Sequence, residues 1–180
     1  MTGAYTEVVV KRKATPSSYA AKAALILGIF VFIGCWLTMA NTFGSISIFL
    51  AIGMVIVTVV LWPSFNVVYE YVYCDGQIDF DKISGGEKRK RMLRVDLDNC
   101  EIMAPENSSE LNAHKSNKQL VEKDFSSLEP NAKKYMLVAS SEKERVRVIF
   151  EPSEEMLELA KQKAPRKVLL DGESGKPYIQ

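Results

Sequence analysis

The feature that most constrains this chain is a long stretch without formal charge. After Lys22 no Asp, Glu, Lys, Arg or His occurs until Glu70, which leaves 47 consecutive uncharged residues. An α-helix rises about 1.5 Å per residue and the hydrocarbon core of a bilayer is about 30 Å thick, so one crossing needs about 20 apolar residues. The stretch is long enough for two crossings, and it predicts a helical hairpin that spans a membrane twice.

The predicted spans run from about residue 23 to 40 and from about residue 45 to 62. The residues between them, Asn41 to Ser45, are small or polar and include a glycine, which is typical of a tight turn. Pro63 ends the second helix because proline cannot continue the hydrogen-bond ladder. Trp36 and Trp62 lie toward span ends, where the headgroup zone favours amphipathic rings.

The cations predict the orientation. Lys11, Arg12, Lys13 and Lys22 precede the first span, and the turn carries no charge. We therefore expect a multi-pass protein of the cell membrane with both termini cytoplasmic. A cleaved signal peptide is the rival interpretation, but no small-x-small cleavage site precedes the second span. A lipoprotein site at Cys35 is disfavoured by Phe32 at the position where a smaller aliphatic residue is usual, so Cys35 is an ordinary thiol.

Charge and composition exclude several classes of function. Residues 1–22 carry a net charge of +3 and the chain from Glu70 onward carries −2, which does not fit a nucleic-acid-binding surface. No CxxC motif occurs, and His114 has no Cys or acidic partner at metal-ligand spacing. No nucleophile motif, phosphate loop or catalytic carboxylate pair is present either. We expect no cofactor, no metal site and no enzymatic activity.

After the apolar stretch the periodicity becomes that of strands. Tyr69, Tyr71 and Tyr73 alternate with their neighbours, and a hairpin turn is predicted at Asp75-Gly76. With a second turn at Gly85-Gly86, residues 66–97 form a three-strand meander, which a short strand at 101–104 extends. The tyrosines are interpreted as lining a half-buried strand in preference to an exposed binding face.

The rest of the chain holds two more strands and a helix. Residues 106–133 are polar and carry either short helices or a binding loop. Strands are predicted at 135–139 and 145–150. A helix capped by Ser153 follows and ends before Pro165. Near the N-terminus, the β-branched segment Thr6 to Lys13 is predicted to be a strand that joins the same sheet.

The order of these elements resembles the bacterial pleckstrin-homology-like (PH-like) membrane proteins. More closely, VYCDGQIDFDKI at 72–83, NCEIMAPENS at 99–108, KDFSS at 123–127 and FEPSEEMLELAKQKAPRKVLLD at 150–171 resemble a family of small bacterial two-span proteins with a PH-like cytoplasmic domain. The family carries no assigned activity. The resemblance implies an α+β membrane protein, in which a two-helix transmembrane hairpin is followed by an antiparallel PH-like β domain closed by a C-terminal helix, and it transfers no catalytic residue.

One cluster of cations is singled out as a contact for anionic lipid headgroups. It comprises Lys88, Arg89, Lys90, Arg91 and Arg94, and it is placed in a hairpin turn, where the alternative is a merely solvated charge run. The glycines at 28, 34, 44 and 53 either let the two helices approach closely or receive a helix from a partner.

These observations predict the organisation and the role of the chain. The predicted parts are an N-terminal cytoplasmic segment (1–22), the transmembrane hairpin (23–62), the PH-like domain (66–171) and a C-terminal tail (172–180). We expect a membrane-anchored, non-catalytic interaction module at the cytoplasmic face of the bilayer, with a membrane or cytoplasmic protein as partner. The alternative is an accessory subunit whose hairpin packs into a larger membrane complex.

Overall fold

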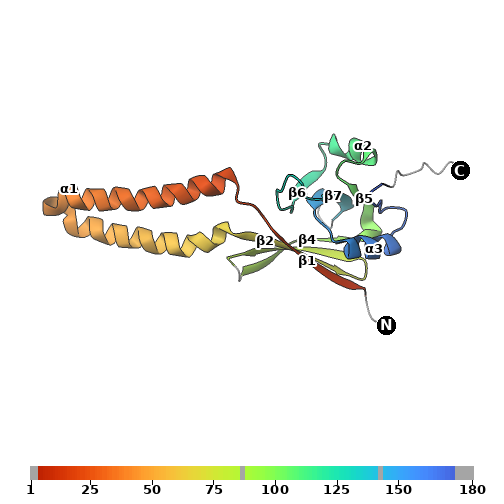
Figure 1. The fold of residues 1–180 in the computed structure, drawn as a ribbon, viewed down its shortest axis with the longest axis horizontal. Coiled ribbons are helices and arrows are strands. Elements are labelled where there is room, and N and C mark those ends of the chain that lie inside the picture. The colour runs from red at the N-terminus through yellow and green to blue at the C-terminus, as the bar shows by residue number, and fades with distance from the viewer. Residues whose placement is uncertain (1–3, 86–87, 142–143, 173–180) are drawn as a thin grey trace. The chain divides into compact units, whose positions relative to one another are not determined.

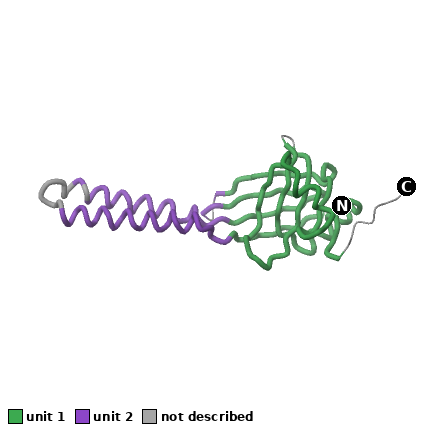
Figure 2. The backbone as a smooth tube through the Cα atoms, turned by 90° about the horizontal axis from the view of Figure 1, so that it is seen from above, with its two compact units in different colours: residues 1–12, 68–83, 89–180 green, residues 13–67, 84–88 purple. Residues whose placement is uncertain are grey.

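The computed structural model describes residues 4–85, 88–141 and 144–172, without the side chains of 39–45 and 47. The chain divides into two compact units (Figures 1 and 2). The first contains residues 1–12, 68–83 and 89–180, and we call it the sheet unit. The second contains residues 13–67 and 84–88, and we call it the helical unit.

The helical unit is a long apolar helix that doubles back on itself. Helix α1 runs over Pro16–Leu61 and is followed by the 3₁₀ helix η1 at Trp62–Phe65 (Figure 1). Thr15 caps α1 by accepting a hydrogen bond from the Ser18 N–H, and Pro16 occupies the first turn, where its missing N–H costs nothing. The two long apolar segments predicted from the sequence are thus present as helix. The turn expected at Asn41 to Ser45 lies among residues whose side chains are outside the described part.

The glycines of the hairpin have different surroundings. A Cβ at Gly28 would clash with the Met54 side chain, so the two helical halves approach closely there, as predicted. A Cβ at Gly34 or Gly53 would meet nothing within 4 Å. For these two residues the prediction of close helix contact is wrong, because a side chain there would have open space around it. Gly44 lies outside the described side chains.

The first sheet of the sheet unit has the strand order β1-β2-β3-β4. Its strands are β1 (Tyr5–Lys11), β2 (Val67–Cys74), β3 (Gln77–Ser84) and β4 (Lys88–Asp96). β1 pairs antiparallel with β2 from Tyr5 opposite Cys74 to Lys11 opposite Val68, which confirms the predicted N-terminal strand. The helical segment is therefore inserted along the chain between two adjacent strands of this sheet, as the predicted N-terminal strand implies.

The turn between β2 and β3 has the predicted chemistry. Asp75 and Gly76 have φ of 47° and 93°, both in the left-handed region that a type I′ hairpin turn requires. The Asp75 carboxylate also accepts a hydrogen bond from the Ala4 N–H at 3.0 Å. The turn therefore fixes the register of β2 and β3 and also holds the start of β1.

The second sheet has the strand order β5-β7-β8-β6. Its strands are β5 (Cys100–Pro105), β6 (Val121–Asp124), β7 (Tyr135–Ser140) and β8 (Arg145–Phe150). β6 pairs with β8 in parallel, so this sheet is mixed. The connection left open by the sequence holds the 3₁₀ helix η3 (Ser109–Leu111), the short helix α2 (Asn112–Lys115) and β6 itself. One further 3₁₀ turn, η2 (Leu97–Asn99), precedes β5.

Helix α3 (Glu154–Lys163) closes the sheet unit. Ser153 caps it, as predicted, by accepting a hydrogen bond from the Met156 N–H at 3.2 Å. Thr6 of β1 donates to the Glu155 carboxylate at 2.9 Å, and the Tyr73 hydroxyl of β2 donates to the Leu159 carbonyl at 3.2 Å. These contacts join the helix to the first sheet.

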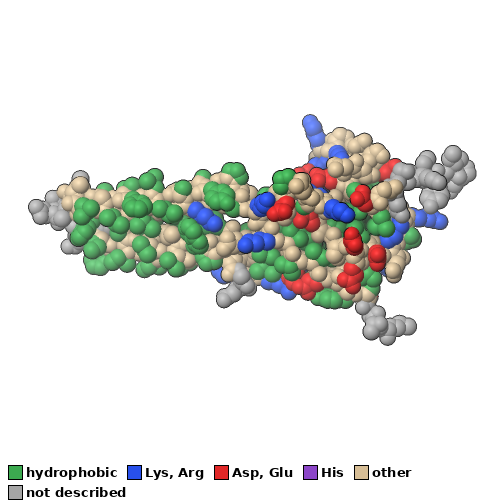
Figure 3. Space-filling view, in the orientation of Figure 1, with side chains coloured by type: hydrophobic (Ala, Val, Ile, Leu, Met, Phe, Trp, Pro, Cys, Tyr) green, Lys and Arg blue, Asp and Glu red, His purple; other side chains and the backbone are tan. Residues whose placement is uncertain are grey.

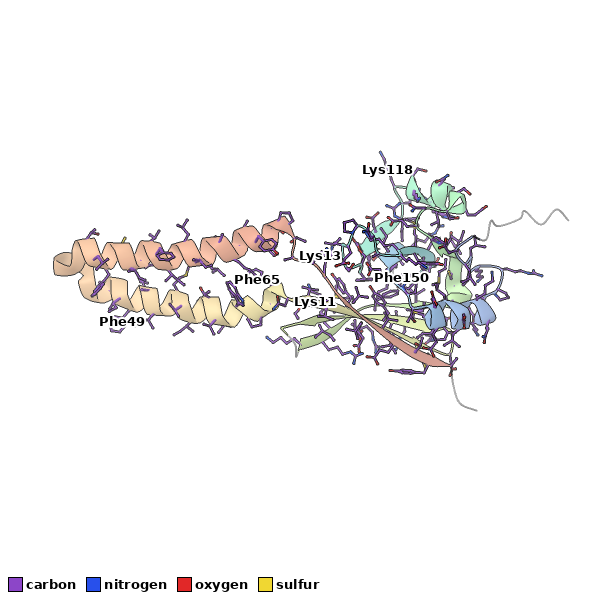
Figure 4. The ribbon with its side chains drawn as sticks, viewed as in Figure 1. Lys11, Lys13, Phe49, Phe65, Lys118 and Phe150 are labelled. Carbon is purple, nitrogen blue, oxygen red and sulfur yellow. The ribbon has the colours of Figure 1, made fainter. Side chains whose placement is uncertain are left out.

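An aromatic cluster forms the core between the two sheets. Tyr71 and Phe80 of the first sheet contact Phe150 of the second with ring centroids 5.6 and 5.3 Å apart, and Phe80 stacks on Phe125 at 5.1 Å. The Tyr71 hydroxyl is fully buried and donates to the Phe125 carbonyl at 2.5 Å. Figure 4 shows Phe150 within this packed interior. The tyrosines of β2 are therefore core residues and do not form a binding face.

The contribution of β1 to this core can be tested with two adjacent valines. Val10 is 9% exposed and faces the core, whereas Val9 is 60% exposed on the other face. Val10→Asn should lower the free energy of unfolding by about 2–3 kcal/mol, because it buries an unsatisfied amide. Val9→Asn should cost under about 1 kcal/mol. Denaturant unfolding of the full chain in mild detergent, followed through the near-UV circular dichroism of the buried tyrosines, measures both, and equal losses would contradict the placement of β1.

Candidate functional site: a charged sheet face

The predicted cation cluster lies on a strand. Lys88, Arg89, Lys90, Arg91 and Arg94 belong to β4, so their placement in a hairpin turn is wrong. The third strand of the predicted meander is thus present, but it begins earlier than expected, because four consecutive cations give no apolar alternation. β4 is an edge strand and residues 88–92 are exposed, so strand formation there needs no buried side chain.

Three of these cations form ion pairs with carboxylates of the same sheet. Arg94 pairs with Asp79 through two hydrogen bonds of 2.6 Å, and Arg91 lies 3.3 Å from the same carboxylate. Arg89 lies 2.5 Å from Glu70 and 2.7 Å from Asp81. We call this set the charged face; its members are Glu7, Glu70, Asp79, Asp81, Arg89, Arg91 and Arg94.

Arg89 is the centre of the charged face. Glu70 and Asp81 are each only 6% exposed, although they lie on the side of the sheet that faces away from the aromatic core. One oxygen of each, Glu70 Oε2 and Asp81 Oδ1, is buried without a hydrogen bond of good geometry. The 2.5 Å contact between Arg89 and Glu70 Oε2 is thus an ion pair that lacks the alignment of a hydrogen bond. The Arg89 guanidinium therefore pairs with both buried carboxylates, and Arg91 Nε lies 3.9 Å from the second of them, Asp81.

The carboxylates of the charged face differ in their acidity. Burial, followed by a hydrogen bond with Glu7, raises the pKa of Glu70. The same hydrogen bond, together with one from the Tyr5 hydroxyl, lowers the pKa of Glu7. The Arg94 guanidinium lowers the pKa of Asp79. Glu7 and Glu70 thus behave as a hydrogen-bonded pair in which Glu70 is the first to take up a proton.

The two lysines of the cluster differ from the three arginines. Lys88 and Lys90 are exposed, and within the described ranges no carboxylate pairs with either. A hollow of about 440 Å³ lies beside β4, lined by Arg91, Arg94 and Lys123, and Lys123 pairs there with Glu144 at 2.8 Å. Most positive charge on this strand is therefore balanced within the fold.

The single histidine and the three cysteines are the remaining candidates for a metal-binding or reactive group. No cluster of three His, Cys, Asp or Glu able to hold a metal ion occurs in the part of the chain that was described. His114 lies in α2, and all three cysteines are free. Burial raises the pKa of the Cys100 thiol to about 12, which keeps it protonated and unreactive.

Two facing sheets closed by a C-terminal helix define the class of this chain as a PH-like α+β protein. The chain belongs to the bacterial family described as "Bacterial PH-like domain (DUF6106)", whose model matches residues 2–170. The match includes β1 and the helical segment inserted after it. No curated protein and no solved structure matches the chain.

The sequence reveals the cations of the charged face but not their partners. Asp79 and Asp81 alternate on one strand, a pattern that by itself indicates only the solvent side of a sheet. Glu7 lies more than sixty residues from its partner Glu70, so only the pairing of β1 with β2 brings them together. One signal in the sequence could have identified these partners. The acids alternate on β3 and the cations follow on the next strand, and opposite charges on neighbouring strands form favourable cross-strand pairs.

Arg89 should be more important for stability than its exposure suggests. Arg89→Gln leaves Glu70 and Asp81 buried without their shared counter-charge, so the free energy of unfolding should fall by about 2–3 kcal/mol. The triple variant Arg89→Gln/Glu70→Gln/Asp81→Asn should recover most of that loss, because it removes the stranded charges as well. Chemical unfolding at pH 7 checks both, and a triple variant no more stable than the single one would contradict this account.

The stabilisation that the Asp79–Arg94 ion pair gives the fold should depend on pH. The folded-state pKa of Asp79 lies below its ordinary value of 3.8, so its stabilisation is present above that pH and is lost as the pH falls through the folded-state value. Asp79→Asn should cost about 1 kcal/mol at pH 7, and the difference from wild type should shrink as the pH falls below the ordinary value and through the lowered folded-state pKa. The exposed Asp171→Asn is the matched control. An undiminished difference in acid would refute the ion-pair origin.

Proposed function

We propose that this protein is a membrane-anchored, non-catalytic interaction module that presents its PH-like domain at the cytoplasmic face of the cell membrane. The observation that carries the proposal is an apolar helical hairpin in which none of the described side chains is buried. The segments Pro16–Thr38 and Ile48–Phe65 have mean hydropathies of 2.2 and 2.4, and no part of either is buried. Figure 3 shows apolar side chains along this unit.

The size of this exposed surface argues for a lipid environment. Phe30, Leu37, Phe49 and Val60 are each more than 60% exposed. Figure 4 shows Phe49 directed away from the helix pair. Soluble monomers rarely expose contiguous apolar patches beyond a few hundred Å², because the patches would associate in water. An 18-residue helix spans about 27 Å, close to the hydrocarbon thickness.

The ends of the hairpin carry the residues expected at a membrane surface. Tyr19, Trp62 and Phe65 lie near its two chain ends, and Trp36 lies toward the turn. Tyrosine and tryptophan prefer the headgroup zone because one part of the ring is apolar and the other polar. Lys13 and Lys22 lie at the chain ends as well. This distribution supports cytoplasmic termini by the positive-inside rule.

The covalent connections support a domain held close to the bilayer. Lys11 and Val68, the last paired residues of β1 and β2, are opposite each other. Only residues 12–15 separate β1 from α1, and only Asn66 separates η1 from β2. At about 3.5 Å per residue, the longer link reaches about 14 Å. In this proposal Lys88 and Lys90 supply the contact with anionic headgroups, while the arginines of the cluster stay paired in the sheet.

A second candidate is an accessory subunit whose hairpin packs into a larger membrane complex. The open space beside Gly34 and Gly53 favours it, because small residues let a neighbouring helix approach closely. Affinity purification in mild detergent distinguishes the two. A stoichiometric membrane partner supports the subunit, whereas transient cytoplasmic partners support the interaction module.

The anchoring and the topology should be visible by cysteine labelling. In a variant lacking the native cysteines, a cysteine at Asn41 should react with a membrane-impermeant maleimide in intact cells, whereas one at Ser174 should react only after lysis. Alkaline carbonate should leave the protein in the membrane fraction, because peripheral proteins are released by this treatment. Extraction by carbonate, or labelling of Ser174 alone in intact cells, would overturn the proposal.

A further inference from the structure

The helical unit contains a cation with an unusual environment. Lys22 Nζ lies 5.2 Å from the Trp62 ring centroid and 5.7 Å from the Phe65 ring centroid. It is half-buried, and across the described side chains no carboxylate or hydrogen-bond acceptor is paired with it. A cation–π contact positions an ammonium group but leaves its charge without a counter-ion.

The composition of the helical unit leaves this charge uncompensated. Its sequence contains Lys13, Lys22 and Lys88 against a single acid, Glu87, and no charge occurs between Lys22 and the end of η1. The segment that carries Lys88 packs on the hairpin end. Gly85, at φ +67°, donates to the Asn66 carbonyl at 3.4 Å, and a Cβ on it would lie 3.2 Å from Pro63. The helical unit therefore holds more cations than acids, and among the described side chains Lys22 has no carboxylate beside it.

We infer that Lys22, positioned by Trp62 and Phe65, binds the phosphate of an anionic phospholipid headgroup. The inference rests on the proposed membrane anchoring. An ammonium group at the edge of an apolar helix pair needs an anion, and the phosphate of the headgroup zone is the anion available at that depth. The rings cover one side of the ammonium, which leaves its other N–H donors for phosphate oxygens. The site is distinct from the cations of β4.

The inference can be tested by counting bound lipids. The full chain, purified in mild detergent with equal amounts of phosphatidylglycerol and phosphatidylcholine, is examined by native mass spectrometry. Wild type should retain phosphatidylglycerol over phosphatidylcholine by about five-fold, the preference expected of one cation near an anionic surface. Lys22→Gln should reduce the ratio to about one, Lys22→Arg should keep it, and Trp62→Leu should reduce it partly because the ammonium is no longer positioned. Circular dichroism establishes that each variant keeps its helix content.

Control variants separate a site from general electrostatics. Lys118→Gln, at an exposed lysine of the sheet unit labelled in Figure 4, should not alter the ratio. Lys13→Gln, in the helical unit, should alter it less than Lys22→Gln does. Equal losses in Lys13→Gln and Lys22→Gln, or an unchanged ratio in Lys22→Gln, would overturn the inference while carbonate resistance still supported anchoring. Binding of glycerol 3-phosphate in lipid-free detergent that depends on Lys22 would instead assign the site to a soluble phosphate, which also overturns it.

Discussion

The antiparallel pairing of β1 with β2 is the interaction on which the rest of the structure depends. It joins two segments separated by the whole helical hairpin, and it places Glu7 diagonally across from Glu70 on one face and Val10 opposite Tyr69 on the other. The first contact organises the charged face and the second completes the aromatic core. β1 and β2 are also the strands that precede and follow the helical segment along the chain.

In the charged face, carboxylates on neighbouring strands balance most of the positive charge of a cation-rich strand. Five cations in seven residues suggest an anion-binding surface, yet three of them are arginines committed to carboxylates on neighbouring strands. Arginine suits this role because its planar group donates to two acceptors at once, whereas lysine presents a point charge. The arginines therefore stabilise the sheet, and the lysines that alternate with them are exposed.

Elements with strong local signals could be predicted from the sequence. The charge-free stretch predicted the long helices, the Asp75-Gly76 pair predicted a turn with two positive φ values, and Ser153 predicted the start of α3. Features that depend on the pairing of strands far apart in the sequence could not be predicted. β6 lies parallel to β8 although its residues read as a polar connection, and the first half of β4 shows no alternation because it is exposed. The partners of Arg89 follow only from the strand order.

The insertion of the hairpin inside a sheet also determines the order in which the chain can fold during synthesis. β1 leaves the ribosome first, but its partner β2 follows only after the entire helical segment has been made, almost sixty residues later. Until then β1 has an unsatisfied edge and no core to cover, and such a long-range pairing is intrinsically slow to form. The PH-like domain can therefore be completed only after the helical segment has left the ribosome.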